Sequence, residues 1–393
     1  MEPVADLTRR LVACDTTSAK SNVPAIELLA DRLESSGFRT RVQAWEADGV
    51  AKSNLVAAAG PAVPGGLIVC GHTDTVPWER QPGWTRDPLA LEIGDDRVYG
   101  RGSSDMKSFI AQAVVAGGAI DRSALRRPLI LVFTADEEVG CLGAARLAPE
   151  LARLLGEIPL PTLCWIGEPT SWEVFHAHKS FAAFDVVVRG RGGHSGLPEL
   201  GLNAIGAATS VLAEIGRYQS ELRANPSPAY REIFPQAPHA TLNVGTIAGG
   251  TAANMIADEC TIRLSTRVLP DADPLGPYRE LARRLAAIDA RDPAAPACRA
   301  EISLGEPLVV PGLLAPRGTE LEAALCDRLG TDSVRGALLG ADGCRFQSIG
   351  VRSLICGPGD FAEAHQPNES ISRRAFEDGV HIVRSVVERL CIG

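Results

Sequence analysis

Short apolar runs that alternate with helical patterns constrain the fold of this chain more than any other feature. The runs LIVC (67–70), RPLILVFTA (127–135), TLCWIG (162–167) and RSLIC (352–356) have the length of buried strands. Between the first two lies DMKSFIAQAVVAGGA (105–119), whose composition favours a helix. Alternating strands and helices are typical of a sheet covered by helices on both faces. We therefore predict an α/β fold with a mostly parallel, doubly wound sheet.

The pattern changes in the middle of the chain. FAAFDVVVRGR (181–191) alternates apolar and polar residues, as a half-exposed strand does, and a long amphipathic helix follows it. The Pro- and Gly-rich region 292–318 resembles a linker. A chain of 393 residues usually holds more than one core. We predict a larger domain of residues 1–179 and 310–393, interrupted by a smaller α+β domain of residues 180–309.

Composition excludes several classes of protein. The formal net charge of −9 argues against a nucleic-acid partner. No run approaches the ~18 apolar residues of a membrane span. The N-terminal segment carries charges where a signal peptide needs an apolar core, so we expect a cytoplasmic location. The ten cysteines form no C-x-x-C pair, which argues against a zinc ribbon or a disulfide framework.

Acidic residues and histidines follow the predicted strands closely. They are His72 and Asp74 after LIVC, Asp136, Glu137 and Glu138 after LILVF, Glu168 after TLCWI, and His365 after SLIC and a GPGD turn. Asp105 stands at the start of a predicted helix. In open α/β sheets, ligands bind outside the carboxyl ends of the strands. These side chains are therefore expected to meet at one edge of the sheet.

Each of these residues also has a simpler interpretation. His72 and Asp74 could be polar residues at a strand end, Asp105 could cap a helix, and Glu137 and Glu138 could form a solvated turn. Taken together, two histidines and several carboxylates make a ligand set for zinc or a similar divalent ion. A carboxylate can also bridge two ions ~3.5–4 Å apart. The joint pattern predicts a metal site.

The adjacent acids Glu137 and Glu138 can have two different roles in the site. Neighbouring side chains diverge, so one carboxylate can bind metal while the other faces the substrate. Clustered negative charge raises the pKa of a carboxyl group toward the value that a general base needs. Asp74 lies two residues beyond His72 on an extended segment, so both face the same way and Asp74 can orient the imidazole.

Six motifs resemble those of one known family. GHTDTVP, YGRGSSDMK, TADEEVG, IGEPT, GRGGHSG and GPGDFAEAHQPNES are similar, in this order, to the motifs of the co-catalytic M20 metallopeptidase and deacylase family. The resemblance covers nearly the whole chain. WTRDP (84–88), AHKS (177–180), TLNVG (241–245) and AHQPNE (364–369) resemble the versions found in the acetylornithine deacetylase group of that family.

The resemblance implies two divalent ions, with zinc expected and cobalt or manganese also compatible with the ligands. His72 and Glu168 would bind the first ion, and His365 and Glu138 the second. Asp105 would bridge the two ions. The family fold is a metal-binding catalytic domain interrupted by a lid and dimerisation domain, so the resemblance implies a homodimer.

The resemblance also assigns roles around the ions. Glu137 would be the general acid/base and Asp74 the partner of His72. His194, in GRGGHSG, would reach the scissile carbonyl when the lid closes, often across a dimer, and stabilise the oxyanion. Asn254 resembles another substrate-contacting position of the lid. A plain turn histidine is the alternative for His194.

Three arginines are candidates for substrate binding. Arg263 and Arg267 are four residues apart on a predicted strand and therefore share a face. They form either a solvated strand face or a clamp for the substrate α-carboxylate. Arg345 lies in ADGCRFQ (341–347), which is more similar to the succinyl-diaminopimelate desuccinylase pattern. Ser108 also departs from the family, which usually has Gly after DMK.

These residues lead to one expected reaction. We expect hydrolysis of the N-acyl amide of an N-acylated amino acid. The main candidate substrate is N-acetyl-L-ornithine, which would give L-ornithine and acetate in a step of arginine biosynthesis. Succinyl-diaminopimelate, another N-acylamino acid or a dipeptide are alternative substrates. The partner would be a small molecule, with no nucleic acid and no membrane. A non-catalytic metal-binding protein is a different hypothesis, and Glu137 argues against it because a binding module needs no unliganded carboxylate there.

Overall fold

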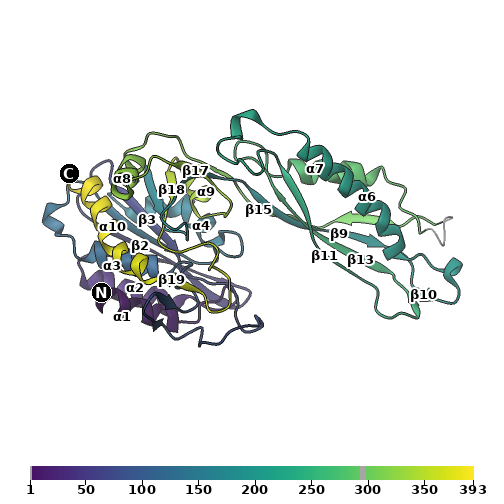
Figure 1. The fold of residues 1–393 in the computed structure, drawn as a ribbon, viewed down its shortest axis with the longest axis horizontal. Coiled ribbons are helices and arrows are strands. Elements are labelled where there is room, and N and C mark those ends of the chain that lie inside the picture. The colour runs from purple at the N-terminus through teal and green to yellow at the C-terminus, as the bar shows by residue number, and fades with distance from the viewer. Residues whose placement is uncertain (1, 293–297) are drawn as a thin grey trace. The chain divides into compact units, whose positions relative to one another are not determined.

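The structure is a computed structural model that describes residues 2–292 and 298–393. The chain divides into two compact units, Met1–Ala177 with Leu313–Gly393, and His178–Gly312 (Figure 1). The chain leaves the first unit after Ala177 and returns after Gly312, whereas the sequence placed these boundaries after residues 179 and 309. The chain crosses between the units near the end of strand β8 (Val174–His178), so the pattern of apolar residues does not mark the boundary sharply.

Nine described strands form the sheet of the first unit, in the order β1-β2-β6-β3-β7-β18-β8-β16, with β17 pairing with β8. Their bounds are β1 Arg39–Ala47, β2 Val50–Ala59, β3 Leu67–His72, β6 Leu129–Thr134, β7 Leu163–Ile166, β8 Val174–His178, β16 Leu313–Leu314, β17 Val334–Ala337 and β18 Arg352–Ile355. Strands β6, β3, β7 and β18 are parallel, whereas β1 and β2 run antiparallel. The four parallel strands contain the four apolar runs, which confirms the α/β class.

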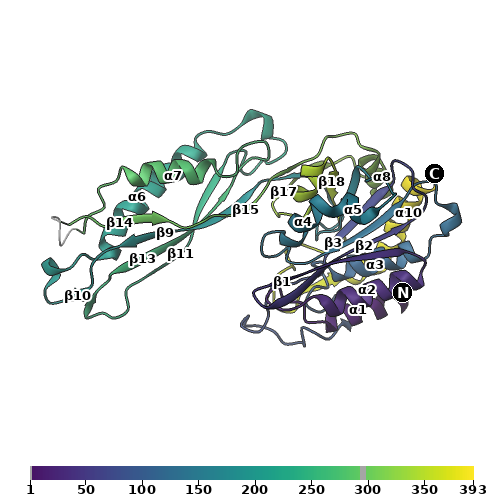
Figure 2. The same cartoon turned by 180° about the vertical axis from the view of Figure 1, so that it is seen from behind.

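Helices cover both faces of this sheet (Figure 1; Figure 2). One apolar core packs alternate strand residues against α1 (Glu2–Ala13), α2 (Val23–Ser35), α3 (Lys107–Gly118), α8 (Glu320–Leu329) and α10 (Arg373–Cys391). The strand residues that point to the opposite face of the sheet, such as Ile68 and Ile130, are equally buried. Helices α4 (Leu142–Leu147), α5 (Leu151–Leu155) and α9 (Gly343–Phe346) contact β2 and β18. The pattern of AARLAPELARLL (144–155) predicts a single helix. The structure divides it, because a 3₁₀ turn containing Pro149 separates α4 from α5.

The second unit contains an antiparallel sheet with two helices. The strand order is β11-β13-β9-β14, with β15 pairing with β9. The bounds are β9 Phe181–Arg189, β11 Thr241–Gly249, β13 Glu259–Arg267, β14 Glu301–Leu304, β15 Leu308–Val310, α6 Ala204–Arg223 and α7 Gly276–Ala286. A separate ribbon pairs β10 (Gly193–His194) with β12 (Met255–Ile256). Both helices pack on the sheet through one apolar core, as the α+β prediction requires.

The sequence did not reveal every element. The linker prediction for 292–318 is wrong at β14 and β15, which pair with β9, and at β16; residues 293–297 of that region lie outside the described residues. Strands this short carry too few residues to show a periodicity, and only their pairing partner specifies them. A small sheet of β4 (Glu92–Ile93), β5 (Arg97–Tyr99) and β19 (Ser370–Ser372) was missed for the same reason.

Several 3₁₀ turns complete the described elements. They are Arg122–Ala124, Ala148–Glu150, Pro198–Leu200, Pro228–Tyr230 and Gln347–Ile349. None of the helices in the described residues has the length and hydropathy needed to cross a membrane.

Candidate metal centre

His72 is the last residue of β3 and lies at the carboxyl edge of the parallel strands. Its ring is 1% exposed, and its Nε2 lies 3.0 Å from Oδ1 of Asp105. The other ring nitrogen, Nδ1, lies 3.0 Å from the backbone oxygen of Asp74 and 3.6 Å from Oδ1 of the same residue. Asp74 therefore contacts the imidazole mainly through its backbone carbonyl, and its carboxylate lies farther away.

Four side chains from separate segments come together beside His72. One group of possible ligand atoms is His72, Asp105 and Glu168, and a second is Asp105, Glu138 and His365. Asp105 belongs to both groups: its Oδ1 faces His72, and its Oδ2 lies 3.3 Å from Nε2 of His365. Nε2 of His365 also lies 3.1 Å from Glu138, and Nε2 of His72 lies 3.8 Å from Glu168. Each group contains one histidine, one carboxylate of its own and the shared aspartate.

The donor set fits divalent cations. Oε1 of Glu168 is buried without a hydrogen-bond partner, an arrangement that is costly for an acceptor unless a cation binds there. Within the described part of the chain, no Lys or Arg pairs with Asp105, Glu138 or Glu168. Imidazole and carboxylate donors around an uncompensated negative charge are the ligands that zinc and related ions prefer.

The pKa shifts in the centre come from hydrogen bonds to carboxylates and from burial. Hydrogen bonds to Asp105 and Glu138 raise the pKa of His365 to about 10. Burial, together with the neighbouring charge of Asp105, raises the pKa of Glu138 and raises that of Glu168 well above its usual value. The carboxylates therefore stabilise positive charge in their midst, which is what a metal ion would supply.

Glu137 belongs to neither ligand group. Burial raises the pKa of its carboxyl group well above the usual value, and the charges of Glu138, Asp342 and Asp74 act in the same direction. The thiol of Cys141 donates a hydrogen bond to its Oε1 at 3.4 Å. Glu137 thus offers a carboxylate beside the two groups without being one of their ligands, which suits a proton-transfer role.

Asp74 and a buried ion pair hold the turn that carries the two glutamates. The carboxylate of Asp74 accepts hydrogen bonds from the backbone N–H groups of Glu137 (3.1 Å) and Glu138 (3.3 Å). Asp136, which begins this turn in the left-handed region with φ of 57°, pairs with Lys52 at 2.6 Å. Asp136 is therefore a structural member of the acidic run, a role that the sequence did not separate from those of its neighbours.

Asp342, the residue before α9, and Arg345 within α9 contact the strand and the turn next to Glu137. Oδ2 of Asp342 accepts a 2.5 Å hydrogen bond from Thr134, the last residue of β6. Nη2 of Arg345 donates to the backbone oxygen of Gly140 at 2.9 Å. Arg345, a candidate substrate ligand from the sequence, thus contacts the backbone three residues after Glu137.

Glu369 holds Asp105, and sequence reasoning missed it. Its Oε1 accepts the backbone N–H groups of Ser104 (2.9 Å) and Asp105 (3.0 Å), and its Oε2 pairs with Arg101 at 2.6 Å. Glu369 and Arg101 are both 1% exposed. The available signal was the last residue of AHQPNE, four positions after His365, which was quoted as part of a motif but given no role.

The remaining candidates lie in the second unit. His194 is exposed on β10, and its Nδ1 accepts the backbone N–H of Gly196 at 3.0 Å, so the proton of the neutral ring is on Nε2. Asn254 lies close by, since its backbone oxygen accepts the N–H of Ser195 at 3.1 Å. The structure thus brings His194 and Asn254 together and leaves the imidazole N–H available as a donor.

Arg263 and Arg267 share a face of β13, as the spacing predicts, but differ in surroundings. Nη1 of Arg263 is 3.5 Å from both carboxylate oxygens of Asp185, and its side chain is largely exposed. The guanidinium of Arg267 lies 5.2 Å from the ring centre of Phe181, and burial lowers its pKa. Arg267 is therefore less exposed to solvent than Arg263.

Comparison with known proteins identifies the family. Residues 68–389 match Peptidase family M20/M25/M40. The acetylornithine deacetylase of Proteus mirabilis is 34% identical over 399 residues, which cover 98% of this chain and 96% of that protein. An alignment of this length and identity, together with the match over most of the chain, shows that the chain belongs to the M20 family. It is therefore a hydrolase.

Solved structures with low sequence identity share the fold. An M20 family metallo-carboxypeptidase from Sulfolobus solfataricus superposes with a TM-score of 0.77 at 16% identity and covers 99% of both chains. The YXEP protein of Bacillus subtilis, described as a dinuclear metal binding peptidase, has a TM-score of 0.63 at 15% identity over 98% of this chain and 97% of that one. The family match and the two ligand groups together support binding of divalent metal ions.

Proposed function

We propose that this protein hydrolyses the amide bond of N-acetyl-L-ornithine, giving L-ornithine and acetate, as a cytoplasmic enzyme of arginine biosynthesis. The observation that carries the reaction class is the pair of ligand groups sharing Asp105, with the carboxylate of Glu137 beside them. The full-length similarity to an acetylornithine deacetylase supports the choice of substrate. ADGCRFQ favours a second candidate of the same chemistry, succinyl-diaminopimelate.

The five residues of the two groups would hold two divalent ions, which we propose to be zinc, with cobalt as a substitute. His72 and Glu168 would bind one ion, His365 and Glu138 the other, and Asp105 both. Two such ions supply a water molecule of lowered pKa and polarise the amide carbonyl. Glu369 keeps Asp105 in place through two backbone hydrogen bonds, so the shared ligand stays fixed.

Glu137 would move the proton that the reaction requires. Its carboxylate accepts a proton from the attacking water as the water oxygen bonds to the acyl carbon. It then delivers the proton to the nitrogen as the C–N bond breaks, so water is consumed and an acid and an amine are released. Asp74 and Cys141 hold Glu137 for this task, the first through the backbone N–H and the second through the carboxylate.

The second unit would serve as the lid and dimerisation domain. We propose that the Nε2–H group of His194 donates to the oxyanion. Asn254 would contact the substrate, and Arg263, Arg267 and Arg345 are the candidates for its carboxylate. Six exposed apolar side chains of this unit support a homodimer: Leu197, Leu200, Ile205, Ile247, Met255 and Leu308.

A substrate panel tests the proposal. Protein loaded with zinc or cobalt is offered N-acetyl-L-ornithine, N-succinyl-diaminopimelate, other N-acylamino acids and a dipeptide, and kcat/KM is compared. Fast turnover of another compound with none of N-acetyl-L-ornithine would refute the substrate. Glu137→Gln should lower kcat by about 10²–10⁴-fold while two metal ions per chain remain bound, as measured by elemental analysis. Near-normal turnover in that variant would refute the role of Glu137.

A further inference from the structure

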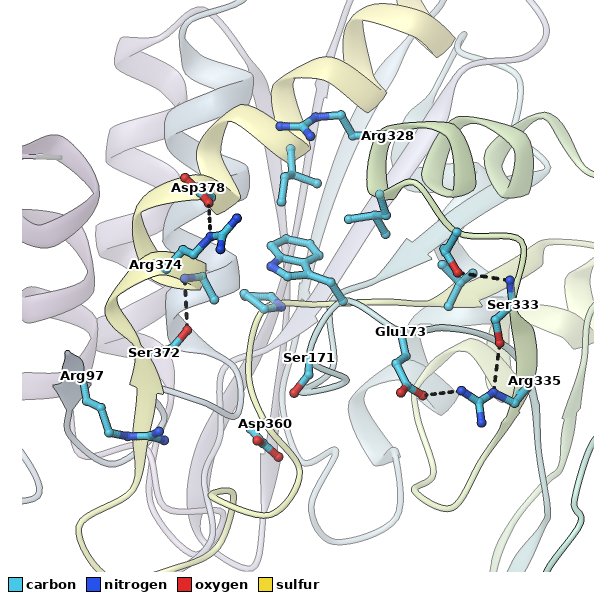
Figure 3. Close-up of a pocket in the computed structure, with 17 residues that line it drawn as sticks. Arg97, Ser171, Glu173, Arg328, Ser333, Arg335, Asp360, Ser372, Arg374 and Asp378 are labelled. Atoms are coloured by element: carbon cyan, nitrogen blue, oxygen red, sulfur yellow. Dashed lines mark hydrogen bonds and ion pairs between the residues drawn. The ribbon is translucent and has the colours of Figure 1, made fainter.

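A polar cavity lies in the first unit, and none of the predicted site residues lines it. Its volume is about 570 Å³. The turn that precedes β8, the segment after α8, β17 and the beginning of α10 form its walls (Figure 3). The volume is in the range of small-molecule sites.

Arginine side chains from four segments face this cavity. Arg97 and Arg374 lie on one side, Arg335 lies on the opposite side, and Arg328 projects from α8 above them (Figure 3). In the described chain, Arg328 has no ion pair or hydrogen bond. Arg374 reaches Asp378 only at 3.4 Å and Arg335 reaches Glu173 only at 3.5 Å, longer than the roughly 2.7–2.9 Å of strong charge-assisted bonds. Arg97 is already engaged, since it pairs with Glu363 at 3.1 Å and donates to Ser370 at 2.7 Å. The carboxylates of Glu173, Asp360 and Asp378 also line the cavity, so its unused capacity for anions comes from Arg328, Arg335 and Arg374.

The lining also includes an apolar surface. Trp172, Val174, Leu329 and Ile382 contribute to the walls. Trp172 is partly exposed and packs against Trp165 at 6.5 Å between ring centres. A ligand that suits these walls has anionic ends for the guanidinium groups and a carbon skeleton for the apolar surface.

We propose that this cavity binds a small organic dicarboxylate and that its binding alters the metal centre. Guanidinium groups on opposite sides favour two separated carboxylates over one, because each end can then form its own charge-assisted hydrogen bonds. This inference goes beyond the proposed hydrolysis, and its binding step does not depend on the identity of the substrate.

The walls of the cavity are bonded to the segments that carry three of the predicted metal ligands. The backbone N–H groups of Ser171 and Trp172 donate to the carbonyls of Gly359 (2.6 Å) and Gly357 (2.7 Å). The N–H of Asp360 donates to Oγ of Ser104 at 2.8 Å. These contacts link the turn after Glu168, the segment before His365 and the residue before Asp105.

The same turn has an uncommon backbone. Ser171 and Trp172 adopt φ angles of 52° and 65°, which residues other than glycine rarely take. Two such residues in succession cost free energy and are often found at binding or switch segments. A ligand that contacts Trp172 contacts a turn that begins only three residues after Glu168. The cavity and this predicted metal ligand are therefore connected by a short segment of chain.

Calorimetric titration tests the binding step on the metal-loaded protein at constant ionic strength. The probes are glutarate, adipate and pimelate, whose separated carboxylates are poor chelators, and neutral adipamide is the control. We expect at least one dicarboxylate to bind and adipamide not to bind. Arg328→Gln should weaken binding about tenfold, equivalent to ~1.4 kcal/mol. Arg384→Gln is the matched control, because Arg384 is an exposed arginine of α10 outside the cavity.

Failure of all three dicarboxylates to bind, or equal affinity in wild type and Arg328→Gln, would overturn the proposal. The coupling is measured as the rate of metal release to a coloured chelator. We expect the saturating dicarboxylate to change that rate at least threefold in the wild type and not in Arg328→Gln. An unchanged rate in the wild type refutes the coupling. Hydrolysis is not part of either measurement, so failure here is distinct from failure of the proposed reaction.

Discussion

The pair Arg101–Glu369 gives a prediction whose magnitude follows from burial. Both side chains are 1% exposed and lie 2.6 Å apart, and Glu369 also accepts two backbone N–H groups. Glu369→Ala would leave a buried guanidinium without its counter-charge and two backbone donors without their acceptor. Removing one partner of a buried pair costs about 3–5 kcal/mol. We expect a loss of that size in the free energy of unfolding.

Urea unfolding followed by tryptophan fluorescence measures this loss. All five tryptophans, at positions 45, 78, 84, 165 and 172, belong to the first unit, so the signal reports the unit that contains Glu369. Glu388→Ala is the control, because Glu388 pairs with Arg384 on the surface of α10, where ion pairs contribute about 0–1 kcal/mol. Glu369→Gln, which keeps an acceptor but loses the charge, should lie between the two.

The outcome also bears on the metal centre. Because Glu369 fixes the backbone of Asp105, Glu369→Ala should weaken metal binding as well as folding, and titration with a coloured chelator measures this. A loss below about 1 kcal/mol, equal to that of Glu388→Ala, would refute the reasoning that this pair is essential to the edge of the sheet.

Three further predictions concern other parts of the molecule. Asp342→Ala should lower kcat more than it changes KM, because Thr134 loses its partner below the turn of Glu137, and steady-state kinetics with unchanged metal content would support this. Removing metal with a chelator should lower the Tm and abolish hydrolysis, and added zinc should restore both. An unchanged Tm would contradict the argument that the carboxylates of the centre need a cation. Burial, with the charge of Arg267, lowers the pKa of Lys179 to about 8, so the folded state binds fewer protons than the unfolded state between pH ~8 and ~10.4. Lys179 therefore makes stability rise with pH in that window, and Lys179→Met should remove this rise relative to wild type in denaturation followed by circular dichroism.

Much of the fold could be predicted from local patterns. Strands β3, β6 and β7 are buried along their whole length, and their apolar runs predict this burial. Strand β18 shows the limit of that argument. Its run predicts a strand, but only the folded chain pairs it with β7, about 190 residues earlier in the sequence. The short strands β14 and β15 depend entirely on β9 for their definition.

The candidate site divides in a similar way. Residue types and their position after strands pointed to His72, Asp105, Glu138, Glu168 and His365 as neighbours, and the structure brings these five together. The supporting residues could not be found in this way. Asp342 and Lys52 contact segments distant in sequence, and Cys141 contacts a turn whose shape no local sequence pattern predicts.

By itself, the sequence determined which chemical groups stand at the ends of the strands, because buried strands need long apolar runs and the polar residues that follow them are conspicuous. Only the tertiary structure decided how those groups are held. It showed that the backbone of Asp74 contacts His72 while its carboxylate holds the turn of the two glutamates, and that Glu369 fixes Asp105. The physical reason is that a hydrogen bond depends on distances of about 3 Å between atoms, which folding sets and residue order does not.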